Sequence, residues 1–206
     1  MFVGKIAGIL IGLCGIAVGQ PGGEGTAAPV PVVESAVNAV RDLGNQVVQG
    51  RYEVAVERMN PLWKERTAAR IGGEAAMKKQ LADVSRQMNQ QGISITSFQP
   101  DGRPRSYEVG PGKKVETVNG RQVESLIYTK WLVLVPTVTK FSLIPPGSTK
   151  PVAIDSTGFQ VAISDKGKSD WTFIDGSSLT LSDLRRLFIN LPEDLVLPPI
   201  GKKESR

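Results

Sequence analysis

Histidine is missing from all 206 residues of the chain. Its absence excludes Ser-His-Asp and Cys-His catalysis, histidine-ligated metal sites and imidazole pH switches. The only cysteine is Cys14, so a product cut downstream of it would have neither a disulfide nor a thiol nucleophile. The acidic residues also lack the clustered spacing of metal ligands. The sequence therefore predicts no metal and no other cofactor.

Long apolar runs are equally scarce, and residues 6–18 form the only one of near-spanning length. Lys5 precedes this run, and the small residues Ala17 and Gly19 occupy the two positions that a signal peptidase reads. We therefore predict a signal peptide at residues 1–19 and export to the periplasm or the exterior of a bacterial cell. The alternative is an uncleaved anchor formed by residues 6–19, although a membrane span needs ~20 apolar residues.

No long run of one charge is present either. Lysine and arginine number 25 against 20 aspartate and glutamate residues, which gives a formal net charge of +5. The basic residues are scattered as pairs with acidic residues between them: Lys78-Lys79, Lys113-Lys114, Arg185-Arg186 and Lys202-Lys203. This distribution is typical of a solvated surface, so we expect no nucleic-acid partner. A membrane is expected as a partner only through an uncleaved signal.

The apolar spacing predicts helices in the first half of the chain. Residues 20–32 are rich in Gly, Pro and Ala and are interpreted as a flexible linker. Apolar residues then recur every three or four positions, which predicts helices over residues 33–49, 51–59 and 74–91. Asn60-Pro61 is expected to break or redirect the chain, because proline disfavours helix in the residue before it. A single domain is predicted over residues 33–200.

Alternation of apolar and polar residues predicts strands from residue 93 onward. The clearest signal is Asn119-Gly120, the favoured pair for a two-residue turn, which joins residues 115–118 to residues 123–135 in a hairpin. Pro136 is expected to interrupt the second of these strands. A further hairpin is predicted around residues 159–175. Its two apolar rows, of which Phe159 and Trp171 are members, are expected to face one core.

The C-terminal part is predicted to hold one more helix, from Leu181 to about residue 190. Thr180 and Asp183 have the spacing of a capping box, with Asp in place of Glu. The apolar, proline-rich residues 195–200 are expected to lie along the domain. Residues 201–206 are predicted to be a charged, frayed tail.

This order of elements predicts an α+β fold, with N-terminal helices packed on a curved antiparallel sheet and an extra C-terminal helix. The pattern resembles the nuclear-transport-factor-2-like superfamily of cone-shaped α+β domains. The resemblance covers residues 33–178 and rests on the N-terminal helices, the Asn119-Gly120 hairpin and the stretch Asp170-Trp171-Thr172-Phe173-Ile174-Asp175. It implies a scaffold that serves both enzymes and binding modules, and whose open sheets often dimerise. Its dehydratase and cyclase members rely on His with Asp, which the absence of histidine disfavours.

Two sets of residues are candidates for a site. Glu124 and Tyr128 lie four apart on the same face of one predicted strand and are candidates for an acid/base pair in a pocket. The alternative is a solvent-facing Glu beside a partly buried Tyr. Trp63, Trp131 and Trp171 are candidates for lining a ligand pocket, with Thr129 and Ser125 as polar anchors beside Trp131. The alternative is that these tryptophans are ordinary core residues.

Three functional hypotheses follow. The first is an exported, non-catalytic module of the bacterial envelope that binds a small ligand or another envelope protein. The second is an isomerase or hydrolase of the same fold that uses a carboxylate base such as Glu124. The third is a structural or assembly protein that forms a homodimer through its sheet.

Overall fold

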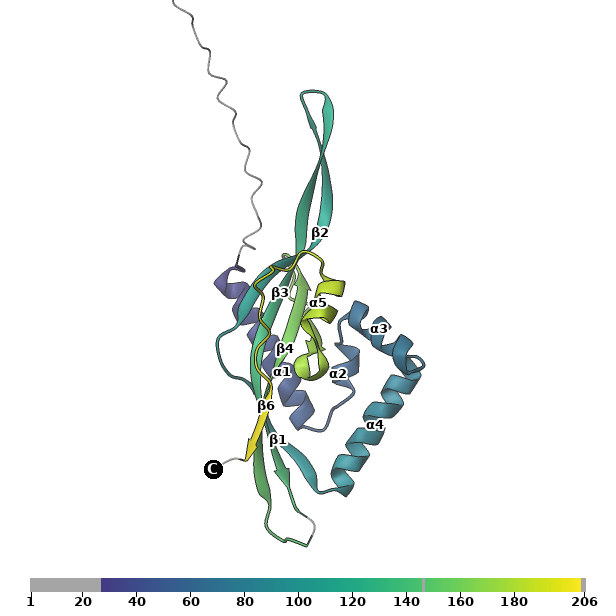
Figure 1. The fold of residues 1–206 in the computed structure, drawn as a ribbon, viewed down its shortest axis with the longest axis vertical. Coiled ribbons are helices and arrows are strands. Elements are labelled where there is room, and N and C mark those ends of the chain that lie inside the picture. Colours follow the sequence, from purple (N-terminus) through teal and green to yellow (C-terminus); the bar gives the residue numbers. More distant parts are fainter. Residues whose placement is uncertain (1–26, 146, 205–206) are drawn as a thin grey trace, which may run out of the picture.

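The computed structural model describes residues 27–145 and 147–204 and has the predicted α+β architecture (Figure 1). The predicted signal peptide and the linker up to residue 26 lie outside the described residues. The helices are α1 (Val30–Val48), α2 (Val54–Glu57), α3 (Pro61–Ile71), α4 (Glu74–Gln90) and α5 (Leu181–Leu187), with a 3-10 turn at Gly176–Ser178. The strands are β1 (Ile93–Pro100), β2 (Arg105–Val118), β3 (Arg121–Leu143), β4 (Val152–Asp165), β5 (Thr172–Asp175) and β6 (Gly201–Glu204). No helix of the described residues has the length and apolarity needed to cross a membrane.

The sheet is antiparallel and organised around β3. On one side β3 pairs with β4 along much of its length, and on the other it pairs first with β2 and then with β1. The predicted interruption at Pro136 is wrong, because the strand continues through it to Leu143. The Pro136 carbonyl accepts a hydrogen bond from the Asp101 N–H (2.9 Å). The proline nitrogen therefore faces the gap between β2 and β1, where the ladder needs no donor.

The central part of the sheet, where β3, β4 and β5 lie together, is buried on both faces, which corrects the expectation of one core for the β4–β5 hairpin. Ala162 pairs with Phe173, and Val161 pairs with Ile174. Side chains of directly opposed residues lie on the same face, so Trp171 and Phe173 face away from Phe159. The α1-side core contains Ala36, Val40, Leu43, Val54, Trp131, Val133, Val135, Ala162, Trp171 and Phe173. The α5-side core contains Trp63, Val109, Leu132, Leu134, Phe159, Val161, Ile163, Ile174, Leu179, Leu184, Phe188, Leu191 and Leu195.

The N-terminal helices differ from the prediction at their ends. Helix α1 begins at Val30, three residues inside the predicted linker, because a proline fits the first turn of a helix. Helix α2 is a single turn, and Pro61 begins α3, a helix that the sequence did not predict. Asn60 joins α3 to the sheet, since its backbone N–H donates to the Phe173 carbonyl (2.8 Å) and its side-chain amide to the Thr172 hydroxyl (3.1 Å).

The C-terminal segment confirms the predicted capping box. The Asp183 N–H donates to the Thr180 hydroxyl oxygen (3.1 Å), and the Asp183 carboxylate accepts from the Thr180 backbone N–H (3.4 Å) and from the Thr180 hydroxyl (2.7 Å). This side-chain hydrogen bond lowers the pKa of Asp183, and the Arg66 and Arg70 guanidinium groups act in the same direction. Residues 201–204 are not frayed as predicted, because they form β6 on the edge of β4. Their backbone pairs while the side chains of residues 202–204 stay in water.

Candidate binding surfaces

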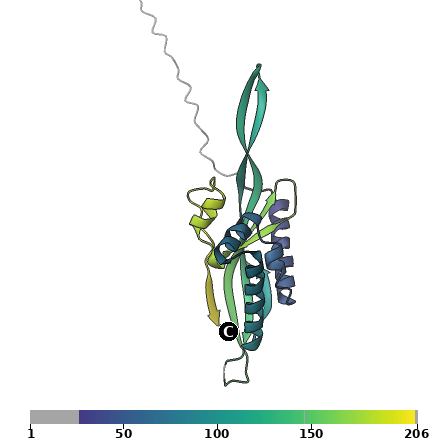
Figure 2. The same ribbon diagram turned by 90° about the vertical axis from the view of Figure 1, so that its right-hand side faces the viewer.

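The distal part of the β2–β3 hairpin projects beyond the rest of the molecule as a narrow twisted ribbon (Figures 1 and 2). We call residues 113–128 the arm, because every side chain in this range is exposed. Its tip is the predicted two-residue turn, with positive φ at both Asn119 (51°) and Gly120 (78°). Among the described residues, β2 pairs with β3 alone, and β3 pairs with β4 only from Lys130 onward. Both edges of the arm are therefore open.

The arm carries a concentration of exposed apolar side chains. Leu126 is 66% exposed and Val115 is 57% exposed. A two-stranded hairpin is marginally stable in water, and it has no second layer in which to bury such groups. The exposed set on the arm is Val115, Val118, Val123, Leu126, Ile127 and Tyr128. Groups of exposed apolar side chains are typical of interaction surfaces, so the arm is a candidate binding surface.

The candidate acid/base pair lies on this arm. Glu124 forms an ion pair with Lys113 on the neighbouring strand (2.6 Å), and both side chains are more than half exposed. Tyr128 lies on the same face and is also exposed. A carboxylate that acts as a general base needs a pKa near the operating pH, and enzymes raise the pKa to that range by shielding the group from water. This geometry gives Glu124 a water-exposed cationic partner instead, so it does not support catalysis by this pair.

The three tryptophan candidates do not line a common pocket. Trp63 belongs to the α5-side core, whereas Trp131 and Trp171 belong to the α1-side core on the opposite face of the sheet. The Trp171 Nε1–H donates to the Ser35 hydroxyl (2.9 Å) on α1. The Thr129 hydroxyl donates to the Gly110 carbonyl (2.5 Å). All three tryptophans are buried, and their packing is that of core residues.

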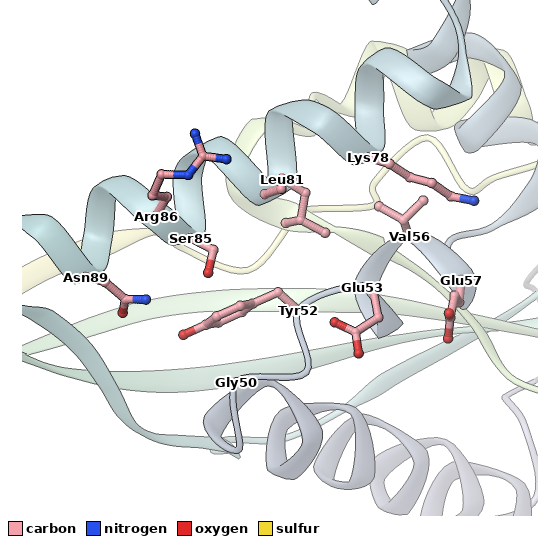
Figure 3. Close-up of a pocket in the computed structure, with 11 residues that line it drawn as sticks. Gly50, Tyr52, Glu53, Val56, Glu57, Lys78, Leu81, Ser85, Arg86 and Asn89 are labelled. Carbon is pink, nitrogen blue, oxygen red and sulfur yellow. The ribbon is translucent and has the colours of Figure 1, made fainter.

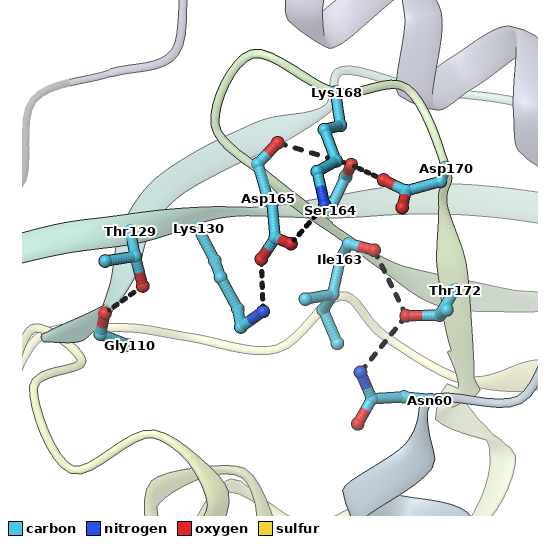
Figure 4. Close-up of polar contacts among 10 residues, drawn as sticks. All are labelled: Asn60, Gly110, Thr129, Lys130, Ile163, Ser164, Asp165, Lys168, Asp170 and Thr172. Carbon is cyan, nitrogen blue, oxygen red and sulfur yellow. Dashed lines mark hydrogen bonds and ion pairs between the residues drawn. The ribbon is translucent and has the colours of Figure 1, made fainter. Parts of the chain in front are cut away.

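A cluster of ion pairs lies at the base of the arm, where β4 turns into β5 (Figure 4). The Asp165 carboxylate accepts from Lys130 and from Lys168, and these hydrogen bonds, Lys130 first, lower the pKa of Asp165. Lys166 pairs with Glu108 of β2 (2.6 Å) and lies over the Trp131 ring at 4.6 Å. These contacts join β2, β3 and β4 directly below the arm, so the cluster anchors the ribbon.

A groove lies between α2 and α4 and has a volume of about 480 Å³ (Figure 3). Tyr52, Val56 and Leu81 give it an apolar middle, and Ser85 and Asn89 line one end. The groove remains open because α4 buries only Met77 among its residues. Tyr52, Val56 and Leu81 belong to the predicted helices 51–59 and 74–91, whose recurring apolar residues would normally pack in a core. The sequence held no signal that α2 and α4 would stand apart.

The described surface thus has two candidate binding features, the arm and the α2–α4 groove. No group of three or more Cys, Asp or Glu side chains in the described ranges is arranged to hold a metal ion. Comparisons of the chain with models of protein families, with curated proteins and with solved structures found no match.

Proposed function

We propose that the chain is an exported, non-catalytic protein-binding module of the cell envelope and that the arm is its binding element. The observation that carries this proposal is the arm itself, a ribbon with open edges and six exposed apolar side chains. An extended edge binds a further strand through backbone hydrogen bonds, and its side chains decide which strand fits. The two buried cores account for most of the other large apolar residues, so the arm is the main unexplained apolar surface of the described sheet.

The partner that the arm fits best is a second copy of this chain. If two β2 strands pair antiparallel about a twofold axis at Val115, the symmetry sets residue Lys114 opposite Glu116 of the other copy. Val115 then lies opposite its own copy. The centre of the interface is thus an apolar pair flanked by two reciprocal ion pairs, a favourable combination for cross-strand neighbours. Within one chain, Lys114 and Glu116 already attract each other (2.7 Å).

Pairing in this way would also stabilise the arm. Two arms side by side make a four-stranded antiparallel sheet, which exceeds the three strands that a sheet with an apolar face needs for independent stability. The β2 edge, which is open in the arm, would gain a backbone partner on each copy. The apolar residues on one face of one ribbon would then neighbour those of the other.

Charge exchange gives a direct test of this pairing. Sedimentation equilibrium of the full chain at low ionic strength is expected to show a dimer. Lys114→Glu sets two acidic residues opposite each other, and Glu116→Lys sets two basic residues opposite each other, so each variant alone is expected to be a monomer. An equimolar mixture of the two variants restores both ion pairs and is expected to form a heterodimer.

The control is Lys79→Glu, an equal change of charge on α4, far from the arm along the chain. It is expected to leave the dimer intact. A wild-type chain that is monomeric at all accessible concentrations would contradict self-pairing, and so would a dimer that neither arm variant weakens.

The family resemblance is part of the same proposal. Its support is the arrangement of N-terminal helices on a curved antiparallel sheet, which is the layout that the nuclear-transport-factor-2-like superfamily implies. Under this proposal the chain uses the scaffold for binding. The arm extends that scaffold beyond its cores.

Export has its own test. Expression of the full chain in a bacterial host, followed by N-terminal sequencing of the product, is expected to give a chain that begins at Gln20. The physical reason is the charged start, short apolar run and small residues that precede this position. Recovery of an intact, membrane-bound chain would support the anchor alternative over cleavage.

A further inference from the structure

The α2–α4 groove has the form of a ligand site that is independent of the arm. In Figure 3, Leu81 and Ser85 point from α4 toward Tyr52, while Glu53 and Glu57 lie on the opposite wall. Val56 is buried and Tyr52 is half-buried, so the middle of the groove is an apolar surface formed by packed side chains. The volume of about 480 Å³ falls within the range of small-molecule sites.

The charges around the groove are unequally compensated. The basic residues of the α4 wall are paired on their own helix, Lys78 with Glu74 (3.2 Å) and Arg86 with Asp83 (3.3 Å). Figure 3 also shows the Arg86 guanidinium pointing away from Tyr52.

Nearby basic residues are engaged as well. Arg58 pairs with Asp42, and the Arg51 side chain, which does not line the groove, donates a hydrogen bond to the neutral Gln49 amide. By contrast, the carboxylates of Glu53 and Glu57 make no ion pair or hydrogen bond with any residue that the structure describes. The groove therefore combines an apolar middle with two uncompensated negative charges on one wall.

We propose that this groove binds a small organic cation, an amine attached to an apolar body. The ammonium group would lie between Glu53 and Glu57, and the apolar body would pack on Tyr52, Val56 and Leu81. A desolvated aromatic ring also attracts a cation, so Tyr52 contributes to both parts of the ligand. An anionic ligand would face two uncompensated carboxylates, and a neutral one would leave them unused.

Three probes with one apolar body separate these cases. The full chain, labelled with ¹⁵N, is titrated at pH 7 with 4-phenylbutylamine, 4-phenylbutan-1-ol and 4-phenylbutyrate. The amine is expected to bind most tightly and to shift the amide signals of Tyr52, Leu81 and Ser85. The alcohol is expected to bind about fivefold to tenfold more weakly, because it makes no ion pair. The carboxylate is expected to bind weakest.

Neutralising the wall tests the assigned residues. The double substitution Glu53→Gln and Glu57→Gln is expected to weaken amine binding about fivefold to tenfold while leaving alcohol binding unchanged. Both residues are exposed, so the variant is expected to fold. Glu65→Gln on α3 is the matched control, since Glu65 is exposed and outside the groove.

Two results would overturn the proposal. One is an alcohol that binds as tightly as the amine, which would leave only a nonspecific apolar cavity. The other is a double variant that retains wild-type affinity for the amine. Neither result touches the arm, because the residues of the groove lie on α2, α4 and their flanks.

Discussion

Replacing Phe159 by alanine is expected to lower the free energy of unfolding by about 4 kcal/mol. Phe159 is 1% exposed and lies in the α5-side core together with Leu132, Ile174 and Leu184. The loss combines the transfer free energy of the ring with the cost of the cavity left behind. Collapse around that cavity is hindered because β4 and β5 hold the neighbouring backbone in a hydrogen-bonded ladder.

Urea unfolding followed by tryptophan fluorescence measures this loss. The control is Ile189→Ala, because Ile189 is 83% exposed and its truncation is expected to change the free energy of unfolding by less than about 0.5 kcal/mol. A loss below about 1 kcal/mol for Phe159→Ala would contradict a well-packed core on this face of the sheet.

The residues of β4 explain why the sequence predicted one core where the structure has two. Large apolar residues alternate with Gln160 and Ala162 along this strand, namely Phe159, Val161 and Ile163. Such alternation is typical of a strand with one face in the core and one face in solvent. Ala162 is nevertheless fully buried, and Gln160 is 7% exposed with its amide donating to Asp175 (3.1 Å). Small and amide residues do not reveal burial by themselves. The cover comes from α1, which is more than a hundred residues away in the sequence.

The long strand β3 shows the opposite difficulty. Residues 123–128 alternate much as residues 131–135 do, and the sequence predicted that both belong to one strand over residues 123–135. The structure buries residues 131–135 on both faces and exposes every one of residues 123–128. Strand pattern fixes which side chains share a face, but the helices that cover that face decide whether it is buried. The sequence therefore predicted the hairpin and its turn but not the arm.

The candidate groove was beyond sequence reasoning for a similar reason. The recurring apolar residues of the segments that form α2 and α4 predict helices, and an apolar stripe on a helix normally packs in the core. Leu81 and Tyr52 instead lie on opposite sides of an open groove. Helix α3 and the turn at Gly72 and Gly73 direct α4 away from α2. Both glycines have positive φ (92° and 106°), a conformation that sets the direction of α4.

Replacing Gly44 by alanine is expected to destabilise the protein by about 2 kcal/mol, although helix propensity alone predicts a gain. Alanine is favoured over glycine within a helix by about 1 kcal/mol. Against this, a Cβ atom on Gly44 would lie 2.2 Å from the Phe98 Cδ1 atom and 2.7 Å from the Phe98 carbonyl oxygen. The ring can rotate, but the carbonyl belongs to β1, which is paired with β3 through Phe98 and Thr139. Helix α1 would therefore have to move off the sheet, and overpacking of this kind costs about 1–3 kcal/mol or more.

The neighbouring residue separates the two effects. Asn45 is exposed on the same helix, so Asn45→Ala brings the gain in helix propensity without a steric conflict. Thermal unfolding followed by circular dichroism is expected to show Asn45→Ala slightly above the wild-type Tm and Gly44→Ala about 6 °C below it. If both variants were stabilised, α1 would not be in close contact with β1. The sign of the Gly44→Ala effect thus tests whether the absence of a side chain at this position is what lets the first helix reach the sheet.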